Sequence, residues 1–231
     1  KYKINSKNKN IIKIYFKNYR NLSQKLIKLK IDTVIHCATH YVKSHDFEDI
    51  KKLSESNIIF GNIILENLKI MRVKKFVNFS TVWENFDGKK ENYFNLYSAY
   101  KASFGKIINF YKQKNKNVKF FNFVISDTFG LTDKRKKIIN LLKTNYNKNL
   151  VTKVVSKNLY INLINVKDIV NAVRLVLKKN YKSDNFILKN KNDFRIYDII
   201  QEINKYSHKK IKIKWLSNKI IKEKTYNFKK L

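Results

Sequence analysis

Short apolar runs rich in β-branched and aromatic residues alternate along this chain with segments of helical periodicity. Strands are expected, in chain order, at 11–16, 33–38, 75–80, 119–125, 160–164, 185–189 and 210–215. Helices are expected at 21–30, with Asn21 as the cap, and at 47–71, 97–111, 134–144, 166–178 and 194–206. This alternation predicts βαβ units and a parallel sheet, and strands apolar along their whole length predict a sheet covered on both faces. The expected fold class is therefore α/β, with a doubly wound parallel sheet that binds ligands at the carboxyl ends of its strands.

The net charge is +34, from 51 Lys and Arg against 17 Asp and Glu in 231 residues. Such a charge is typical of proteins that bind nucleic-acid phosphates. Arginine, which nucleic-acid sites use as a bidentate fork, occurs at only five positions. Glycine and proline are scarce while Lys, Asn, Ile, Phe and Tyr abound, the pattern that an AT-rich genome imposes. We therefore expect no nucleic-acid partner. The hypothesis of a basic nucleic-acid-binding protein ranks third, behind two hypotheses on enzymes. It predicts a clustered positive face and an affinity for nucleic acid that falls steeply with salt.

No segment resembles a membrane span or a signal peptide, because no apolar run approaches about 18 residues. The single cysteine, Cys37, permits no internal disulfide. We expect a cytoplasmic protein without a membrane partner. The chain begins at Lys1 and its one methionine is Met71, so a fragment or a processed product is expected.

The stretch "NFSTVWENFDGKKENYFNLYSAYKASF" (78–104) combines hydroxyl, phenol and amine groups. Tyr97 and Lys101 are four residues apart and would share a helix face. The ammonium would favour the phenolate and so lower the pKa of Tyr97. A hydroxyl of Ser80 or Thr81 would hold the oxygen of a reacting carbonyl or alcohol. Such a set suits proton transfer coupled to hydride transfer.

The Tyr-x-x-x-Lys spacing alone decides nothing, because the chain contains it three times, as Tyr97/Lys101, Tyr206/Lys210 and Tyr226/Lys230. Only Tyr97 opens an expected helix that follows a strand ending in a Ser-Thr pair. Only there would two strand ends, at Ala38 and Ser80, meet at one sheet edge. The context therefore favours Tyr97 and Lys101.

Five segments follow one another in a collinear order: "IDTVIHCAT" (31–39), "ESNIIFGNIILENLKIMRVKKFVNFST" (55–81), "NLYSAYK" (95–101), "FNFVISDTFGLTDKR" (121–135) and "YINLINVKDIVNAV" (160–173). Together they resemble the extended short-chain dehydrogenase/reductases, the NAD-dependent nucleotide-sugar epimerases, dehydratases and reductases. "STVWENF", "NLYSAYKASF", "DTFGLTDKRKKIINLL" and "IKIKW" are similar to the branch that contains CDP-abequose and CDP-paratose synthases. Enzymes of that branch reduce the carbon-4 ketone of a CDP-linked deoxy sugar.

The resemblance implies a Rossmann-type fold and a catalytic role for four residues. Tyr97 would be the acid/base, and Lys101 would hold the nicotinamide ribose. Thr81 would bond the reacting oxygen, with Ser80 as the alternative. Each also has a plain structural interpretation: a helix-face tyrosine, a solvated lysine, and hydroxyls that merely end a strand.

The resemblance further implies that Ala38, Thr39 and Asn57 lie along the cofactor, NAD or NADP. For Asn57, bonding to backbone is favoured over contact with substrate. A nucleotide-sugar substrate would be contacted by Trp83, Glu84, Asn85 and Arg135, although packing in a surface loop or at a solvated helix start explains these residues as well. A homodimer is implied. No metal is expected, because His36 and His40 have a ligand spacing only on a helix and lie at an expected strand end.

The family's TGxxGxxG loop, whose glycines let the backbone approach the cofactor pyrophosphate, is absent. The likeness begins near the family's third strand, so about fifty residues of the fold would precede Lys1. We expect a truncated NAD(P)-binding Rossmann domain at 1–130. At 131–231 we expect a substrate-binding lobe with returning Rossmann elements. The expected function is an NAD(P)-dependent nucleotide-sugar epimerase, dehydratase or reductase acting at the carbon-4 keto or hydroxyl group of an NDP-deoxyhexose. The alternative is a non-catalytic truncated remnant of such an enzyme.

Overall fold

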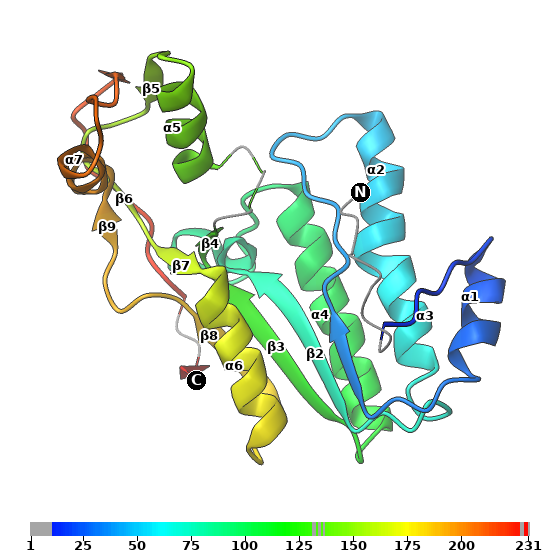
Figure 1. Ribbon diagram of the computed structural model, residues 1–231. Coiled ribbons are helices and arrows are strands. Elements are labelled where there is room, and N and C mark those ends of the chain that lie inside the picture. Colours follow the sequence, from blue (N-terminus) through cyan, green and yellow to red (C-terminus); the bar gives the residue numbers. More distant parts are fainter. Residues whose placement is uncertain (1–10, 131–132, 134, 136, 227–228, 231) are drawn as a thin grey trace.

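A parallel sheet forms the centre of the computed structural model, which describes residues 11–130, 133, 135, 137–226 and 229–230 (Figure 1). Its strand order is β1-β2-β3-β8-β12, and every neighbouring pair is parallel. The strands are β1 (Thr33–His36), β2 (Lys75–Thr81), β3 (Lys119–Ile125), β8 (Asp184–Leu188) and β12 (Lys229–Lys230). This arrangement confirms the predicted Rossmann-type α/β class.

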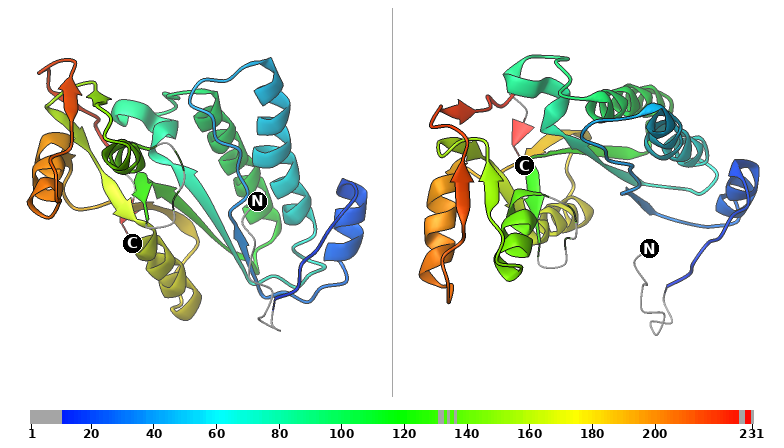
Figure 2. Two further views of the ribbon diagram at one scale, coloured as in Figure 1. Left: turned by 45° about the horizontal axis from the view of Figure 1, so that its top comes forward. Right: turned by 90° about the horizontal axis from the view of Figure 1, so that it is seen from above.

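Helices cover both faces of this sheet, as the view from above shows (Figure 2). On one face lie α4 (Leu96–Lys114) and the continuous helical segment α2 (Phe47–Ser54), η1 (Glu55–Ile59) and α3 (Phe60–Glu66), with α1 (Tyr19–Leu26) at its side. The opposite face is covered by α6 (Val166–Lys178). Alternate residues of β2 point to opposite faces, so Phe76 joins the core under α4 while Val77 joins the core under α6.

Three small sheets lie beyond the carboxyl ends of the main strands. They pair β4 (Asp127–Phe129) with β7 (Leu163–Asn165), β5 (Thr152–Val154) with β10 (Ile213–Trp215), and β6 (Leu159–Ile161) with both β9 (Phe194–Arg195) and β11 (Ile221–Lys222). Helices α5 (Ile138–Asn147) and α7 (Ile196–Lys205) pack on them around Leu142, Ile196 and Ile200. The domain boundary at residue 130 stays a prediction.

Two expectations for the first thirty residues are wrong. Residues 11–16 form no strand and are exposed, because no neighbouring strand supplies their backbone with hydrogen bonds among the described residues. The first helix begins at Tyr19 and is capped by Asn18, whose side chain accepts from the Asn21 N–H at 2.9 Å. Asn21 was therefore the capped residue, and Asn18 the cap.

Several other boundaries differ for local reasons. The helix expected at 47–71 ends at Glu66, because Asn67 bonds back to the Ile63 carbonyl and Arg72 adopts a positive φ of 61°. The strand expected at 160–164 is divided at Asn162, whose amide bonds to the segment around Asn190. The helix expected at 134–144 begins at Ile138, and residues 134 and 136 lie outside the described residues. The remaining expected strands and helices are present with small shifts at their ends.

Among the described residues, no helix combines the length and the apolar character needed to span a bilayer.

Candidate active site

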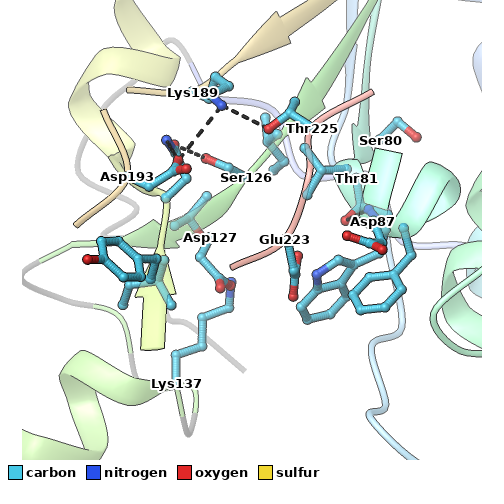
Figure 3. Close-up of a pocket in the computed structure, with 18 of the residues that line it drawn as sticks. Ser80, Thr81, Asp87, Ser126, Asp127, Lys137, Lys189, Asp193, Glu223 and Thr225 are labelled. Carbon is cyan, nitrogen blue, oxygen red and sulfur yellow. Dashed lines mark hydrogen bonds and ion pairs between the residues drawn. The ribbon is translucent and has the colours of Figure 1, made fainter. Parts of the chain in front are cut away.

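A cavity of about 260 Å³ lies where the main sheet ends and the small sheets begin. Ser80 and Thr81 at the end of β2 and Ser126 after β3 line one side of it. The β6 strand and the segment around Glu223 line the cavity as well (Figure 3). Parallel α/β sheets bind ligands at this edge, so the cavity is the candidate site.

Tyr97 lines the cavity from the first turn of α4. A capping box fixes that turn, because Asn95 accepts from the Ser98 N–H at 3.0 Å and Ser98 accepts from the Asn95 N–H at 3.2 Å. The rings of Tyr97 and Tyr41 pack edge to face, with their centroids 5.1 Å apart. Burial disfavours the phenolate and raises the pKa of Tyr97 to about 12, although the Thr39 side chain opposes the shift. The expected lowering of this pKa by Lys101 is therefore wrong for the protein as it stands.

Lys101 lies one turn further along α4 and is only 4% exposed. It does not line the cavity. Burial disfavours the ammonium and lowers the pKa of Lys101 to about 8, while the charge of Glu84 and then Cys37 opposes this shift. The structure therefore places Lys101 behind the wall of the site, with Glu84 as its electrostatic neighbour.

Ser80 and Thr81 both line the cavity, and they lie on opposite faces of β2. The Ser80 hydroxyl is buried without a hydrogen-bond partner, and Figure 3 shows it pointing away from the acidic side chains that are labelled there. The Thr81 side chain caps the 3₁₀ segment η2 (Val82–Gly88), with its oxygen 3.4 Å from the Trp83 nitrogen. A hydroxyl can accept and donate at the same time, so Thr81 can still donate to a ligand oxygen in the cavity.

Asn57 fixes the loop that leaves β1. Its side-chain oxygen accepts from the Thr39 hydroxyl at 3.0 Å and from the His40 N–H at 2.7 Å, and its amide donates to the His40 carbonyl at 3.0 Å. Asn57 belongs to η1, a π-helical turn of the kind that often marks functional sites. Asn57 therefore bonds to backbone, as expected.

Thr39 lines both the candidate site and a second cavity, which Ala38 also lines beside Phe16 and Phe60. The two predicted cofactor residues after β1 therefore both line cavities at the strand end, and Thr39 lines two of them. His36 and His40 have different partners. The Nδ1 atom of His36 lies 3.0 Å from the Asn78 oxygen and its ring packs on Phe104, whereas Nε2 of His40 lies 3.2 Å from the Asp49 carboxylate.

The four expected substrate residues are divided between two cavities. Trp83 lines the site, with its ring centroid 5.0 Å from that of Phe94. Arg135 also lines the site, where it donates to the Asp133 carboxylate and, at 2.8 Å, to the Thr128 hydroxyl. Glu84 and Asn85 instead line a separate cavity of about 250 Å³.

Sequence reasoning missed four acidic residues around the site: Asp87, Asp127, Asp193 and Glu223. Burial and the charges of the three aspartates raise the pKa of Glu223 to about 7. Asp127 is paired with Lys137 at 3.0 Å. These residues come from separate segments, so no local pattern signals their meeting.

The model of the NAD dependent epimerase/dehydratase family matches residues 1–190. The chain belongs to this family. The predicted family is therefore confirmed.

Two curated relatives are CDP-abequose synthases. The one from Yersinia pseudotuberculosis is 24% identical over 190 residues, which cover 80% of this chain and 66% of the relative. The one from Salmonella muenchen is 21% identical and covers 81% of this chain and 64% of the relative. This chain therefore spans slightly less than two thirds of the length of these relatives.

A solved structure of UDP-glucuronic acid 4-epimerase from Bacillus cereus, in complex with UDP-glucuronic acid and NAD, superposes with a TM-score of 0.72. Its sequence is 20% identical, and the match covers 87% of this chain and 68% of the epimerase. At this identity the likeness shows a shared fold.

Proposed function

We propose that this chain carries the proton-transfer site of an NAD(P)-dependent nucleotide-sugar oxidoreductase or epimerase. Its reaction would take place at the carbon-4 keto or hydroxyl group of an NDP-deoxyhexose. The observation that carries the proposal is that Tyr97, Ser80 and Thr81 line one cavity at the carboxyl end of a parallel sheet. The similarity to CDP-abequose synthases supports a CDP-linked sugar as the first substrate to test.

The residues around this cavity fit the nicotinamide end of the cofactor. Thr39 lines both the site and the neighbouring cavity at the end of β1, which supports placing the cofactor along Ala38 and Thr39. The pyrophosphate end has no counterpart, because Gly61, Gly88, Gly105 and Gly130 are too far apart to form a glycine loop. When bound, the cofactor would supply or accept a hydride at the sugar carbon.

Tyr97 would act as the proton donor when a ketone is reduced. Because its pKa is about 12, the phenol is protonated at neutral pH and can donate to the oxygen that gains negative charge. The hydroxyl of Thr81 or Ser80 would hold that oxygen. In the reverse direction Tyr97 would accept the proton, and for this step it must first be a phenolate. Burial disfavours the phenolate, so a positive charge near Tyr97 would be needed to stabilise it.

Arg135 and Trp83 would contact the substrate. A guanidinium is suited to the diphosphate of a nucleotide sugar, and the indole offers an apolar face to the sugar ring. A homodimer forms part of this proposal, and light scattering after gel filtration measures it directly.

The test compares Tyr97→Phe with Tyr206→Phe. Tyr206 also has a lysine four residues later, but it is 84% exposed and lies outside the cavity. Each variant is assayed for NADH and NADPH oxidation with a CDP-4-keto-6-deoxyhexose, and product stereochemistry is read by NMR. Loss of a positioned acid should lower kcat by about 10²–10⁴-fold in Tyr97→Phe, with Tyr206→Phe unchanged. Equal turnover in both variants would overturn the assignment of Tyr97.

A further inference from the structure

We propose that this protein binds an oligophosphate anion at the amino end of its main sheet, in a cavity separate from the candidate active site. The cavity has a volume of about 440 Å³, within the range of about 300–1,000 Å³ that is usual for small-molecule sites. It is lined by residues of two segments, 68–74, which leads from α3 into β2, and 114–118, which leads from α4 into β3. Figure 1 shows both strands beginning at the end of the sheet that lies away from the small sheets. The inference does not depend on the proposed function.

The charge of this cavity has one sign. Five of the described side chains that line it are cationic and none is acidic; the cationic residues are Lys69, Arg72, Lys74, Lys114 and Lys116. In three other cavities the two signs are balanced, with histidine counted as neutral. The candidate site has four cationic and four acidic residues, the cavity beside Glu84 has two of each, and the cavity beside Ala38 has one of each. The high lysine content of the chain therefore does not by itself produce a cavity of this kind.

The cationic groups of the cavity have no anionic partner. Among the described residues, no ion pair joins any of the five to a carboxylate, and Lys114 lies 5.8 Å from the centre of the Phe110 ring. Lys75, the first residue of β2, behaves differently, because its ammonium donates to the Val176 carbonyl at the end of α6 at 3.0 Å. The lysines of the cavity are thus available to a ligand, whereas Lys75 is already used by the fold.

Lysines near the end of a helix often compensate its negative dipole, and α3 and α4 both end at this cavity. Asparagine amides take that role here. The Asn67 amide donates to the carbonyl four residues earlier at 2.7 Å, and the Asn115 amide does the same at 3.0 Å. Each helix end carries only about half a negative charge, so five cationic groups leave the cavity strongly positive. The two segments are also held side by side, because the Lys119 N–H donates to the Lys74 carbonyl at 2.8 Å.

The kind of cation and the rest of the lining point to phosphate groups. Lysine binds phosphate as a point charge, and Arg72 adds a planar fork. All five cationic residues are exposed, so a single contact is weak and an anion that carries several phosphates on one small molecule is favoured. Single-stranded nucleic acid is bound largely by stacking of its bases on aromatic rings, and no aromatic residue is among the described residues that line this cavity. These features favour an oligophosphate over nucleic acid.

The test measures the binding of inorganic triphosphate to the whole chain by isothermal titration calorimetry at low salt. The cavity variant combines three substitutions of exposed lysines that line the cavity: Lys69→Gln, Lys74→Gln and Lys116→Gln. The control variant combines three substitutions of exposed lysines around β10 that line none of the four cavities: Lys212→Gln, Lys214→Gln and Lys219→Gln. Both variants lose three positive charges, so any effect of net charge is common to both.

We expect the cavity variant to bind triphosphate about tenfold more weakly than the wild type, because each exposed charge contact contributes a factor of up to about five. The control variant should bind triphosphate as the wild type does. Equal weakening in both variants would overturn the proposal, because the net charge would then account for the binding.

A second measurement needs no substitution. In ¹⁵N-labelled wild type, the backbone amide signals of residues 68–74 and 114–118 should shift at the lowest triphosphate concentrations. Shifts that rise together over the whole basic surface would refute a distinct site. Neither measurement needs a nucleotide sugar or a nicotinamide cofactor, so failure of this proposal leaves the carbon-4 chemistry untouched, and failure of that chemistry leaves this site untouched.

Single-stranded oligothymidylate tests nucleic acid as the source of the phosphates. Its charges extend over a larger surface than the cavity, and its bases find no ring there, so we expect it to bind the cavity variant and the control variant equally. If the cavity variant loses more affinity for oligothymidylate than for triphosphate, the cavity is a nucleic-acid site and the proposal is wrong.

Discussion

A methyl group added at Gly61 should destabilise this protein more than its helical position suggests. Gly61 lies in α3, directly beneath α4. A Cβ at this position would be 2.3 Å from Cζ and 2.7 Å from Cε2 of Phe104, and 3.0 Å from Nε2 of His36. Both rings are buried, and their centroids are 5.0 Å apart. Neither ring can retreat without displacing the other.

The magnitude follows from two opposing effects. Overpacking of a close-packed core costs about 1–3 kcal/mol, and two confined rings favour the upper end of that range. Replacing a helical glycine by alanine raises the free energy of unfolding by about 1 kcal/mol through helix propensity. We therefore expect Gly61→Ala to lower the free energy of unfolding by about 2 kcal/mol.

Gly105 supplies the matched control. It lies inside α4, and a Cβ there would meet no atom within 4 Å. Gly105→Ala should therefore raise the free energy of unfolding by about 1 kcal/mol through helix propensity alone. The two variants should differ by about 3 kcal/mol, which corresponds to about 6–12 °C in Tm for a chain of this size.

The assay is urea unfolding followed by circular dichroism at 222 nm, with thermal unfolding as a second measure. Gly61→Ala that is as stable as Gly105→Ala would refute the reasoning, because it would mean that α3 and α4 do not pack at the distance that the structure shows. A change in the urea m-value instead of the midpoint would point to an altered unfolded state.

Two further predictions concern the residues behind the site. Burial lowers the pKa of His36 to about 4, so His36 contributes stability above about pH 6.5 that is lost as the pH falls toward 4, about 3 kcal/mol in full. Glu84, whose pKa is raised to about 7, has the opposite effect on stability between about pH 7 and 4.5. The free energy of unfolding of the wild type is therefore compared with that of His36→Gln at each pH. If the two curves of unfolding free energy against pH are parallel, the prediction for His36 is wrong. Asn57→Ala should cost about 2–3 kcal/mol, because it leaves the His40 N–H and carbonyl without their partner, whereas Asn62→Ala on the exposed side of α3 should be nearly neutral in the same unfolding assay.

Local sequence patterns predicted the elements whose stability is decided locally. The helix at 166–178 and the strand at 119–125 were found with their observed ends, because one has clear helical periodicity and the other is an uninterrupted apolar run. The segment 11–16 has equally good strand chemistry but no strand beside it. Strand formation depends on a partner that may be distant in sequence, so propensity alone misled there.

The candidate site was predictable in part for the same reason. The strand end and the helix start drew attention to Thr81 and Tyr97, and the family resemblance drew attention to Thr39; all three line the cavity. The acidic residues Asp193 and Glu223 could not be found, since tertiary packing of the small sheets brings them to the cavity. The raised pKa of Tyr97 was also missed, because the spacing of Tyr97 and Lys101 says nothing about burial or about Glu84.

A row of polar side chains across four neighbouring strands helps to fix the register of the main sheet. His36, Asn78, Asn122 and Asn185 are register partners on four neighbouring strands. The Asn78 amide donates to the Asn122 oxygen at 2.7 Å, and the Asn122 amide donates to the Asn185 oxygen at 2.8 Å. A slip of one residue would set these polar groups against phenylalanines and leave the buried Asn78 amide unpaired, which is costly. The row therefore helps to fix the register that sets Ser80 opposite Val124 and Thr81 opposite Ile125, and of these four residues Ser80, Thr81 and Ile125 line the cavity.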